Sequence, residues 1–263
     1  ITPPEMFARF DPPFRRLLEQ GTREIAGLRD KVVLAMADST FNATCLEELG
    51  YTNVRVVPLL LDLSGLLEIP PAPLPDLELP APGAGPLILF VGRVAPNKGH
   101  QQLVKAFHVL KTYHHRDARL WLVGGKAHGR YRAAVDHLIA GLGLRDVVFT
   151  GPIGDPQLAS VFRRADVYLS LSAHEGFGVP LIEAMAHGIP VVAWDTTAVG
   201  ETMGSAGLML RDPSPLTAAE AVVMVLKDAE VRDDLVARGR ARVAHFSAER
   251  SSAAFMGALL EAV

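Results

Sequence analysis

The sequence predicts an α/β protein with a doubly wound parallel sheet, joined to part of a second α/β unit. Two observations predict the sheet: short apolar runs alternate with amphipathic helical stretches, and the runs are continuously apolar, as in parallel strands covered on both faces. A third observation, a proline-rich stretch, divides the chain in two. The 263 residues suffice for one large domain plus a fragment.

The first 64 residues contain one predicted strand–helix–strand unit preceded by a helix. The leading helix is expected over Phe14–Leu28, an apolar run covers Val32–Ala37, a helix ends near Gly50, and a strand covers Val54–Val57. A single βαβ unit is too small to form a Rossmann domain by itself. We therefore interpret residues 1–64 as the remnant of another domain.

Residues 65–86 form the proline-rich stretch. Such a run cannot join a helix or a central strand, so it predicts a stiff linker between domains. Its prolines are Pro70, Pro71, Pro73, Pro75, Pro80, Pro82 and Pro86.

Residues 87–245 are predicted to form a Rossmann-like domain, followed by a C-terminal helix over 246–263, and the tail from Ala218 to Val263 predicts two or three helices in all. Open sheets of this kind bind ligands beyond the carboxyl ends of their strands. The expected strands are Leu87–Val91, Leu120–Val123, Val147–Thr150, Val167–Leu171, Pro190–Ala193 and a weaker Leu208–Leu210. The expected helices between them are Gln101–Tyr113, Tyr131–Ala140, Pro156–Arg164 and Leu181–Ala186.

Composition excludes several function classes. The formal net charge of -3 gives no electrostatic reason to expect nucleic acid or an anionic membrane as the main partner. The single cysteine, Cys45, rules out an intrachain disulfide, disfavours a Cys/His zinc site and fits a reducing, cytoplasmic compartment. No apolar run approaches the roughly 18 residues of a transmembrane helix, and no secretory pattern opens the chain. The absence of an initiator methionine indicates that the chain begins within a gene or after processing.

The loop after the first strand of the large domain carries the pattern of an anion site. Gly92 allows a sharp turn at the strand end, and Arg93 and Lys98 flank the start of the next helix. Helix N-termini attract anions, and a guanidinium fork with a point charge suits a diphosphate. The structural alternative is a pair of solvated surface cations, but the strand–loop–helix context favours anion binding.

The second candidate loop contains two acids around two glycines. Gly176 and Gly178 permit close approach of the backbone to a ligand, and Pro180 suits the first turn of the following helix. Glu183 is expected in that first turn, pointing back to the crevice, and Glu175 lies on the loop. One carboxylate would hold a sugar hydroxyl and the other a vicinal diol such as ribose.

Each of these residues also has a structural interpretation. Glu183 could serve only as a partner of the helix dipole, and Glu175 as an exposed loop acid. Phe177 is expected to anchor the loop by packing, and His174 is at least as compatible with a packed or solvated position as with ligand contact. The pairing of the acidic loop with the Arg93 and Lys98 loop favours the functional interpretation.

These motifs resemble retaining glycosyltransferases of family 4, which have the GT-B fold. Residues from Pro86 onward resemble the family's C-terminal donor domain, and residues 1–62 look like the end of its acceptor domain, including Asp38-Ser39 at the start of a helix. The matching stretches in the donor part are Val91-Gly-Arg with Lys98-Gly99, Ala165-Asp-Val-Tyr-Leu-Ser170, Glu175-Gly-Phe-Gly-Val-Pro-Leu-Ile-Glu183-Ala and Pro190-Val-Val-Ala193.

The resemblance implies a role for each matching residue. Glu175 is the catalytic candidate, though not as a general base, because the sequence shows no partner that would tune it. The implied donor-binding residues are Gly92, Arg93 and Lys98 around the diphosphate, Glu175 with the amides of Gly176, Phe177, Gly178 and Val179 at the sugar and phosphate, Glu183 at the ribose and Ile153 against the base.

The implied activity is transfer of a hexose from a nucleotide diphosphate sugar to a glycan, lipid or small-molecule acceptor, with retained configuration. The resemblance implies no cofactor and no metal, and no Asp-x-Asp motif is present. It implies a cytoplasmic protein. Peripheral attachment to the inner membrane would normally reside in the first domain of the family and is left open.

The sequence also departs from the family. Residues 197–201 read Thr-Ala-Val-Gly-Glu where relatives often have Gly-Gly-x-Pro-Glu, and Leu59-Leu60-Leu61 replaces the Asn-Gly often found before the linker aspartate, Asp62. Most of the first Rossmann domain is absent. Two other functions therefore stay open: a binding module for nucleoside diphosphates that is inactive without the missing domain, and a nucleotide-sugar epimerase of GT-B fold. An epimerase would need no acceptor.

Overall fold

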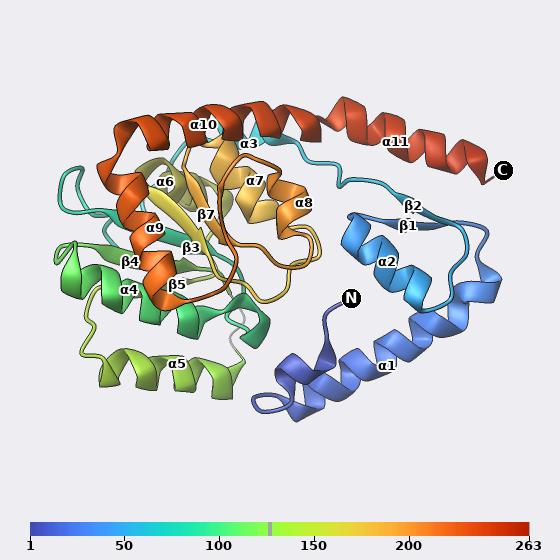
Figure 1. Ribbon diagram of the computed structural model, residues 1–263, viewed down its shortest axis with the longest axis horizontal. Coiled ribbons are helices and arrows are strands. Elements are labelled where there is room, and N and C mark those ends of the chain that lie inside the picture. The colour runs from blue at the N-terminus through green and yellow to red at the C-terminus, as the bar shows by residue number, and fades with distance from the viewer. Residues whose placement is uncertain (126–127, 263) are drawn as a thin grey trace.

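The computed structural model describes residues 1–125 and 128–262 and contains two parallel sheets (Figure 1). The larger sheet has six strands in the order β5-β4-β3-β6-β7-β8, and the smaller one pairs β1 with β2. The predicted α/β class with a doubly wound parallel sheet is therefore confirmed. The strands are β1 Ala35–Ala37, β2 Val54–Val56, β3 Leu87–Val91, β4 Arg119–Val123, β5 Val147–Gly151, β6 Val167–Ser170, β7 Val191–Trp194 and β8 Leu208–Leu210.

The order of the six strands fixes where a ligand site can form. Counted from β3, the chain first builds outward to β5 and then crosses back to place β6 on the other side of β3. Loops leaving β3 and β6 therefore diverge to opposite faces, which opens a crevice at the carboxyl edge between these two strands. The strand order is that of a Rossmann fold.

Helices cover both faces of the large sheet, which explains why its strands are apolar throughout. α4, α5 and α9 lie toward one face and α6, α7 and α10 toward the other (Figure 1). Central strands β3, β6 and β7 are almost completely buried. The helices are α1 Pro12–Leu28, α2 Thr40–Glu48, α3 Leu63–Glu68, α4 His100–Tyr113, α5 Gly129–Gly141, α6 Asp155–Arg164, α7 Val179–Ala186, α8 Val199–Met203, α9 Pro215–Lys227, α10 Ala229–Val243 and α11 Ala248–Glu261, with short 3-10 helices at Pro4–Phe7, Arg29–Lys31, Pro96–Lys98 and Ala244–Phe246.

The small sheet is the predicted βαβ unit, with α2 crossing between its two parallel strands. Side-chain caps begin both helices of this part of the chain. The Asp11 carboxylate accepts from Phe14 N before α1, and the Ser39 hydroxyl accepts from Asn42 N before α2. Such caps satisfy amides that have no partner inside the helix.

The proline-rich stretch is not free of secondary structure. α3 crosses the expected linker start at residue 65, because the Asp62 carboxylate caps it and the first proline comes only at Pro70. Beyond α3 the stretch lies against the large domain: Leu74 is buried, and the Ser160 hydroxyl of α6 donates to Ala72 O. The prediction that the whole stretch excludes helix was wrong at its first turn.

The C-terminal helix α11 leaves the large domain and runs beside the small sheet (Figure 1). Arg55 on β2 pairs with Glu261 at 2.9 Å, and the Ser251 hydroxyl donates to Leu59 O. The C-terminal helix therefore contacts the small sheet and the segment that follows it.

Candidate functional site

Two loops meet at the carboxyl edge of the large sheet, where β3 and β6 lie side by side. The first loop, residues 92–99, follows β3, and the second, residues 171–178, follows β6. Gly99 lets them approach: its φ is +67°, and a Cβ there would lie 2.0 Å from the Leu171 carbonyl oxygen. Only a glycine combines this backbone conformation with such a close contact.

The two loops are joined by hydrogen bonds and by one ion pair. The Asn97 carbonyl accepts from Ala173 N at 2.9 Å and from His174 N at 3.3 Å. Lys98 Nζ lies 2.6 Å from Glu175 Oε2, and the two side chains are only 17% and 12% exposed. The structure therefore brings together two residues that the sequence analysis placed on separate candidate loops.

Backbone amides of the second loop are available to a ligand. Among the described residues, no hydrogen-bond acceptor is found for the amide nitrogens of residues 176–179. Gly178 has φ +92° and precedes α7, and neither α7 nor α4 has a side-chain cap. Both helices start at the edge where β3 and β6 end. Uncapped N-termini with free amides form an anion-binding environment.

Glu183 lies in the second turn of α7, because the helix already begins at Val179, and the prediction of a first-turn position was wrong. Burial raises the pKa of Glu183, and the charge of Asp155 adds to this effect. Burial also raises the pKa of Tyr168 well above its ordinary value, and the charges of Glu175 and Glu183 contribute to that shift. The buried Tyr168 hydroxyl bonds to the backbone of Val91 at the end of β3.

The other predicted residues occupy different positions around the crevice. Arg93 is exposed, whereas Ile153, in the loop after β5, is partly buried against the core. Gly92 extends the β3–β4 pairing by donating to Val123 O. Phe177 is 6% exposed and packs edge-to-face on Phe246, as expected for an anchor of the loop.

Thr197 holds Glu175 from the loop after β7. Its hydroxyl accepts from Glu175 N at 2.9 Å and donates to Glu175 O at 2.8 Å. Thr197 has φ +50°, a strained conformation for a β-branched residue. Nearby, the Glu201 carboxylate accepts from the amide and the hydroxyl of Thr40 at the start of α2.

Sequence reasoning missed several residues that shape this site: Asn97, Tyr168, Thr197, Glu201, Ser39 and Asn42. Ser39 carried a detectable signal, since a serine before a helical stretch predicts a cap. The contacts of Thr197 and Asn97 join loops that are far apart in the chain, and no local pattern indicates them.

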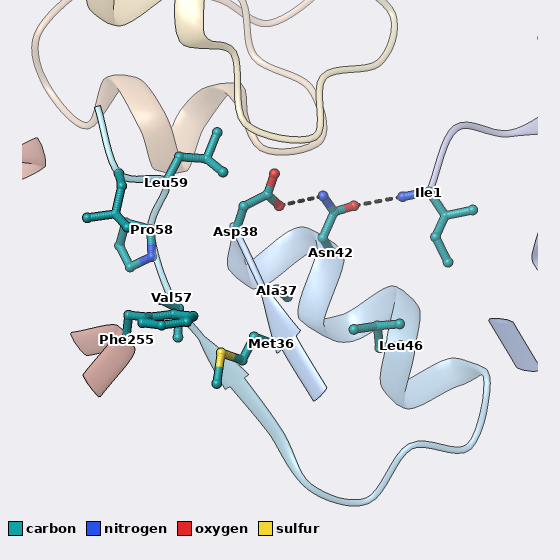
Figure 2. A pocket seen from close by; sticks show the side chains of 11 residues that line it. Ile1, Met36, Ala37, Asp38, Asn42, Leu46, Val57, Pro58, Leu59 and Phe255 are labelled. Carbon is teal, nitrogen blue, oxygen red and sulfur yellow. Dashed lines mark hydrogen bonds between the residues drawn. The ribbon is translucent and has the colours of Figure 1, made fainter. Parts of the chain in front are cut away.

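A separate concavity of about 470 Å³ lies at the small sheet, between α2 and α11 (Figure 2). Its walls are mainly apolar, with Met36, Leu46 and Phe255 among them. Asp38 and Asn42 are its polar members, and Asn42 also donates to Gly176 O. Asn42 therefore lines the concavity and also contacts the second loop.

We expect a pH-dependent stability effect at Glu183. Because burial raises its folded pKa, proton uptake stabilises the folded state below the ordinary pKa of 4.5, and this contribution is lost as pH rises through the folded pKa. Glu183→Gln should therefore unfold at a higher urea midpoint than the wild-type chain at pH 7–8, with the gap closing as pH falls. Glu47→Gln, an exposed acid on α2, is the control. A gap that is constant with pH would contradict the prediction.

Comparison with known proteins decides the family. A family model described as glycosyl transferases group 1 matches residues 78–242, well over half of the chain. The chain belongs to the group 1 glycosyltransferases. The matched range includes both loops of the crevice. Assignment to family 4 within this group stays a prediction.

Relatives of this group 1 glycosyltransferase extend beyond the present chain. A D-inositol 3-phosphate glycosyltransferase of Paenarthrobacter aurescens is 33% identical over 180 residues, which is 67% of this chain and 44% of the relative. The enzyme of the same name from Xylanimonas cellulosilytica is 30% identical over 257 residues, which is 92% of this chain and 59% of the relative. The chain thus spans about half the length of these curated relatives.

Solved structures establish the GT-B type of fold. The Anabaena protein HepE, in complex with UDP and glucose, matches with a TM-score of 0.77 at 21% identity, covering 91% of this chain and 66% of that one. In the part of the chain that the structure describes, no helix is both long and apolar enough to cross a bilayer. No cluster of three or more His, Cys, Asp or Glu side chains suited to a metal ion is found there either.

Proposed function

We propose that the protein is a retaining hexosyltransferase of family 4 and that this chain supplies mainly its donor-binding half. The observation that carries the proposal is the crevice between β3 and β6, where Lys98 meets Glu175 beside the free amides of residues 176–179. Cations and amides so arranged suit a diphosphate. The complex of HepE with UDP and glucose supports a nucleotide-sugar donor.

In the proposed reaction the nucleoside diphosphate gains negative charge as its bond to the sugar breaks. Arg93, Lys98 and the amides of residues 176–179 would stabilise that charge more in the transition state than in the ground state. Because Glu175 holds Lys98 and the amides belong to the backbone of the second loop, these groups need little reorganisation. No covalent nucleophile is invoked.

Glu175 is the proposed catalytic contact to the donor sugar, and its carboxylate is held by Lys98 and its backbone by Thr197. Glu183 is proposed to bind the ribose and Ile153 to lie against the base. We propose that the reaction needs no metal or cofactor and takes place in the cytoplasm. The acceptor would be a glycan, lipid or small molecule, and the relatives named for inositol phosphate belong to the last class.

Calorimetric titration with UDP, GDP and ADP, without divalent metal, tests the donor site. We expect one diphosphate to bind, and Arg93→Ala and Glu183→Ala each to weaken it by about 1–3 kcal/mol, as for lost charged hydrogen bonds. Arg16→Ala, an exposed arginine on α1, is the matched control and should bind like wild type. Binding that ignores both substitutions would place the nucleotide elsewhere.

Activity assays separate the remaining alternatives. Transfer by a version with a complete first domain, but not by this chain, would assign this chain a binding role alone. Interconversion of a nucleotide sugar without any acceptor would instead identify an epimerase and refute the transferase proposal.

A further inference from the structure

The carbonyl group of Gly176 is held from the other side of the crevice. The Ser39 hydroxyl donates to Gly176 O at 2.6 Å, and Asn42 Nδ2 approaches the same oxygen at 3.3 Å. Ser39 is 1% exposed, so this bond is shielded from water. The start of α2 in the small unit therefore touches the loop that carries the candidate donor amides.

Asn42 is itself oriented by its neighbours. Its Nδ2 donates to Asp38 Oδ1 at 2.7 Å, and its Oδ1 accepts from the Ile1 amino group at 2.8 Å (Figure 2). The Glu201 carboxylate binds the amide of Thr40, the next residue after Ser39. The start of α2 is thus fixed by contacts with the second loop and with helix α8 of the large domain.

Because the peptide group is planar, the hydrogen bond from Ser39 to Gly176 O also sets the direction of the Phe177 amide. Gly176 O and Phe177 N–H belong to one trans peptide, so they point in opposite directions. Anchoring the oxygen on α2 aims the Phe177 amide away from α2. That amide has no acceptor among the described residues, and it is one of the four amides assigned above to the donor.

We propose that Ser39 is a positioning residue that sets the Gly176–Phe177 peptide for donor binding. Through this peptide, the position of the small unit controls how tightly the second loop binds the donor. When α2 moves away, the Gly176 carbonyl loses its hydrogen bond to Ser39, and the Phe177 amide is no longer held in one orientation. The inference rests on the proposed function, because it needs a diphosphate or donor sugar at residues 176–179.

The test compares UDP with UMP, or the diphosphate and monophosphate of whichever base the wild-type chain prefers. Ser39→Ala should weaken UDP binding by about tenfold and UMP binding by less than about twofold, because one positioned hydrogen bond at the distal phosphate is lost. Ser39→Thr, which keeps the hydroxyl, should restore UDP binding.

Ser39 also caps α2, so a control must weaken that helix without touching the loop. Thr44→Gly does so from an exposed position in the middle of α2 and should leave both affinities unchanged. The inference is overturned if Ser39→Ala weakens UDP and UMP binding equally, or if Thr44→Gly weakens UDP binding as much as Ser39→Ala does. Either result would mean that Ser39 acts only as a cap of α2.

A second measurement uses the ligand-free chain. In amide NMR spectra, Ser39→Ala should shift the Phe177 resonance and Thr44→Gly should not, because the Phe177 amide shares its peptide group with the anchored carbonyl. An unmoved Phe177 resonance overturns the inference while leaving the proposed function intact. If the wild-type chain binds none of UDP, GDP and ADP, the proposed function is overturned. The inference then also fails, because it requires a ligand at residues 176–179.

Discussion

Replacing Gly99 by alanine should destabilise the chain by about 3–5 kcal/mol and abolish nucleotide binding. The new Cβ would lie 2.0 Å from the Leu171 carbonyl oxygen, in a backbone conformation with φ +67°. This oxygen is a backbone atom of the residue that directly follows β6, so it cannot rotate away as a side chain would. The two loops must therefore separate, which moves Lys98 away from Glu175.

Gly143→Ala is the matched control for Gly99→Ala. Gly143 has φ +66°, and no atom lies within 4 Å of a Cβ built there, so alanine at this position meets only the conformational cost. That cost should be about 1–2 kcal/mol. Urea unfolding of both variants would then separate strain from the steric contact. Equal destabilisation of the two variants would show that the structure moves to relieve the contact with the Leu171 carbonyl oxygen at no cost.

Replacing Lys98 by methionine should have the second largest effect. Its ammonium group is the partner of a carboxylate that is 12% exposed, so the variant leaves Glu175 charged and largely desolvated. We expect a loss of about 1–3 kcal/mol in unfolding free energy and of about 2–4 kcal/mol in diphosphate binding, or roughly 30- to 1000-fold. Lys105→Met, an exposed lysine on α4, controls for the lost surface charge.

Glu175→Gln should act in the opposite direction on the diphosphate alone. Removing the carboxylate frees Lys98 for the phosphates, so UDP should bind as well as in wild type or better, whereas sugar transfer by a complete protein should fall. The double variant Lys98→Met/Glu175→Gln should recover stability lost in Lys98→Met, because no unpaired charge remains. Urea unfolding and UDP calorimetry of all four chains complete the cycle. Additive losses would mean that the ion pair does not couple the loops.

Local pattern predicted the elements of the large domain well. β3 and β8 have the predicted bounds, and the neighbouring strands and α4–α7 lie within about two residues of the expected ranges. Strands covered on both faces need unbroken apolar runs, so the sequence alone indicates which strands are buried. The same logic identified the candidate loops, because Gly92, Gly176 and Gly178 interrupt these runs at strand ends.

Two helix starts, those of α7 and α3, differ from the prediction. Pro180 lies in the first turn of α7 as expected, but the helix begins at Val179 rather than at Leu181, so Glu183 falls one turn later than expected. The start of α3 depends on the Asp62 cap rather than on the prolines that follow. At α3 a capping side chain decides the boundary, whereas α7 has no side-chain cap and begins after Gly178, whose φ is +92°.

The sequence by itself determined the α/β class, the strand-ending loops and the residue types suited to a diphosphate, because each depends on neighbours within a few positions of the chain. Only the tertiary structure decided which of these residues meet. Lys98 and Glu175 are 77 positions apart, and Ser39 and Gly176 are 137 apart. The crossover that places β6 beside β3 joins the first pair, and the docking of α2 joins the second, because hydrogen bonds and ion pairs require contact in space, which strand order and packing supply.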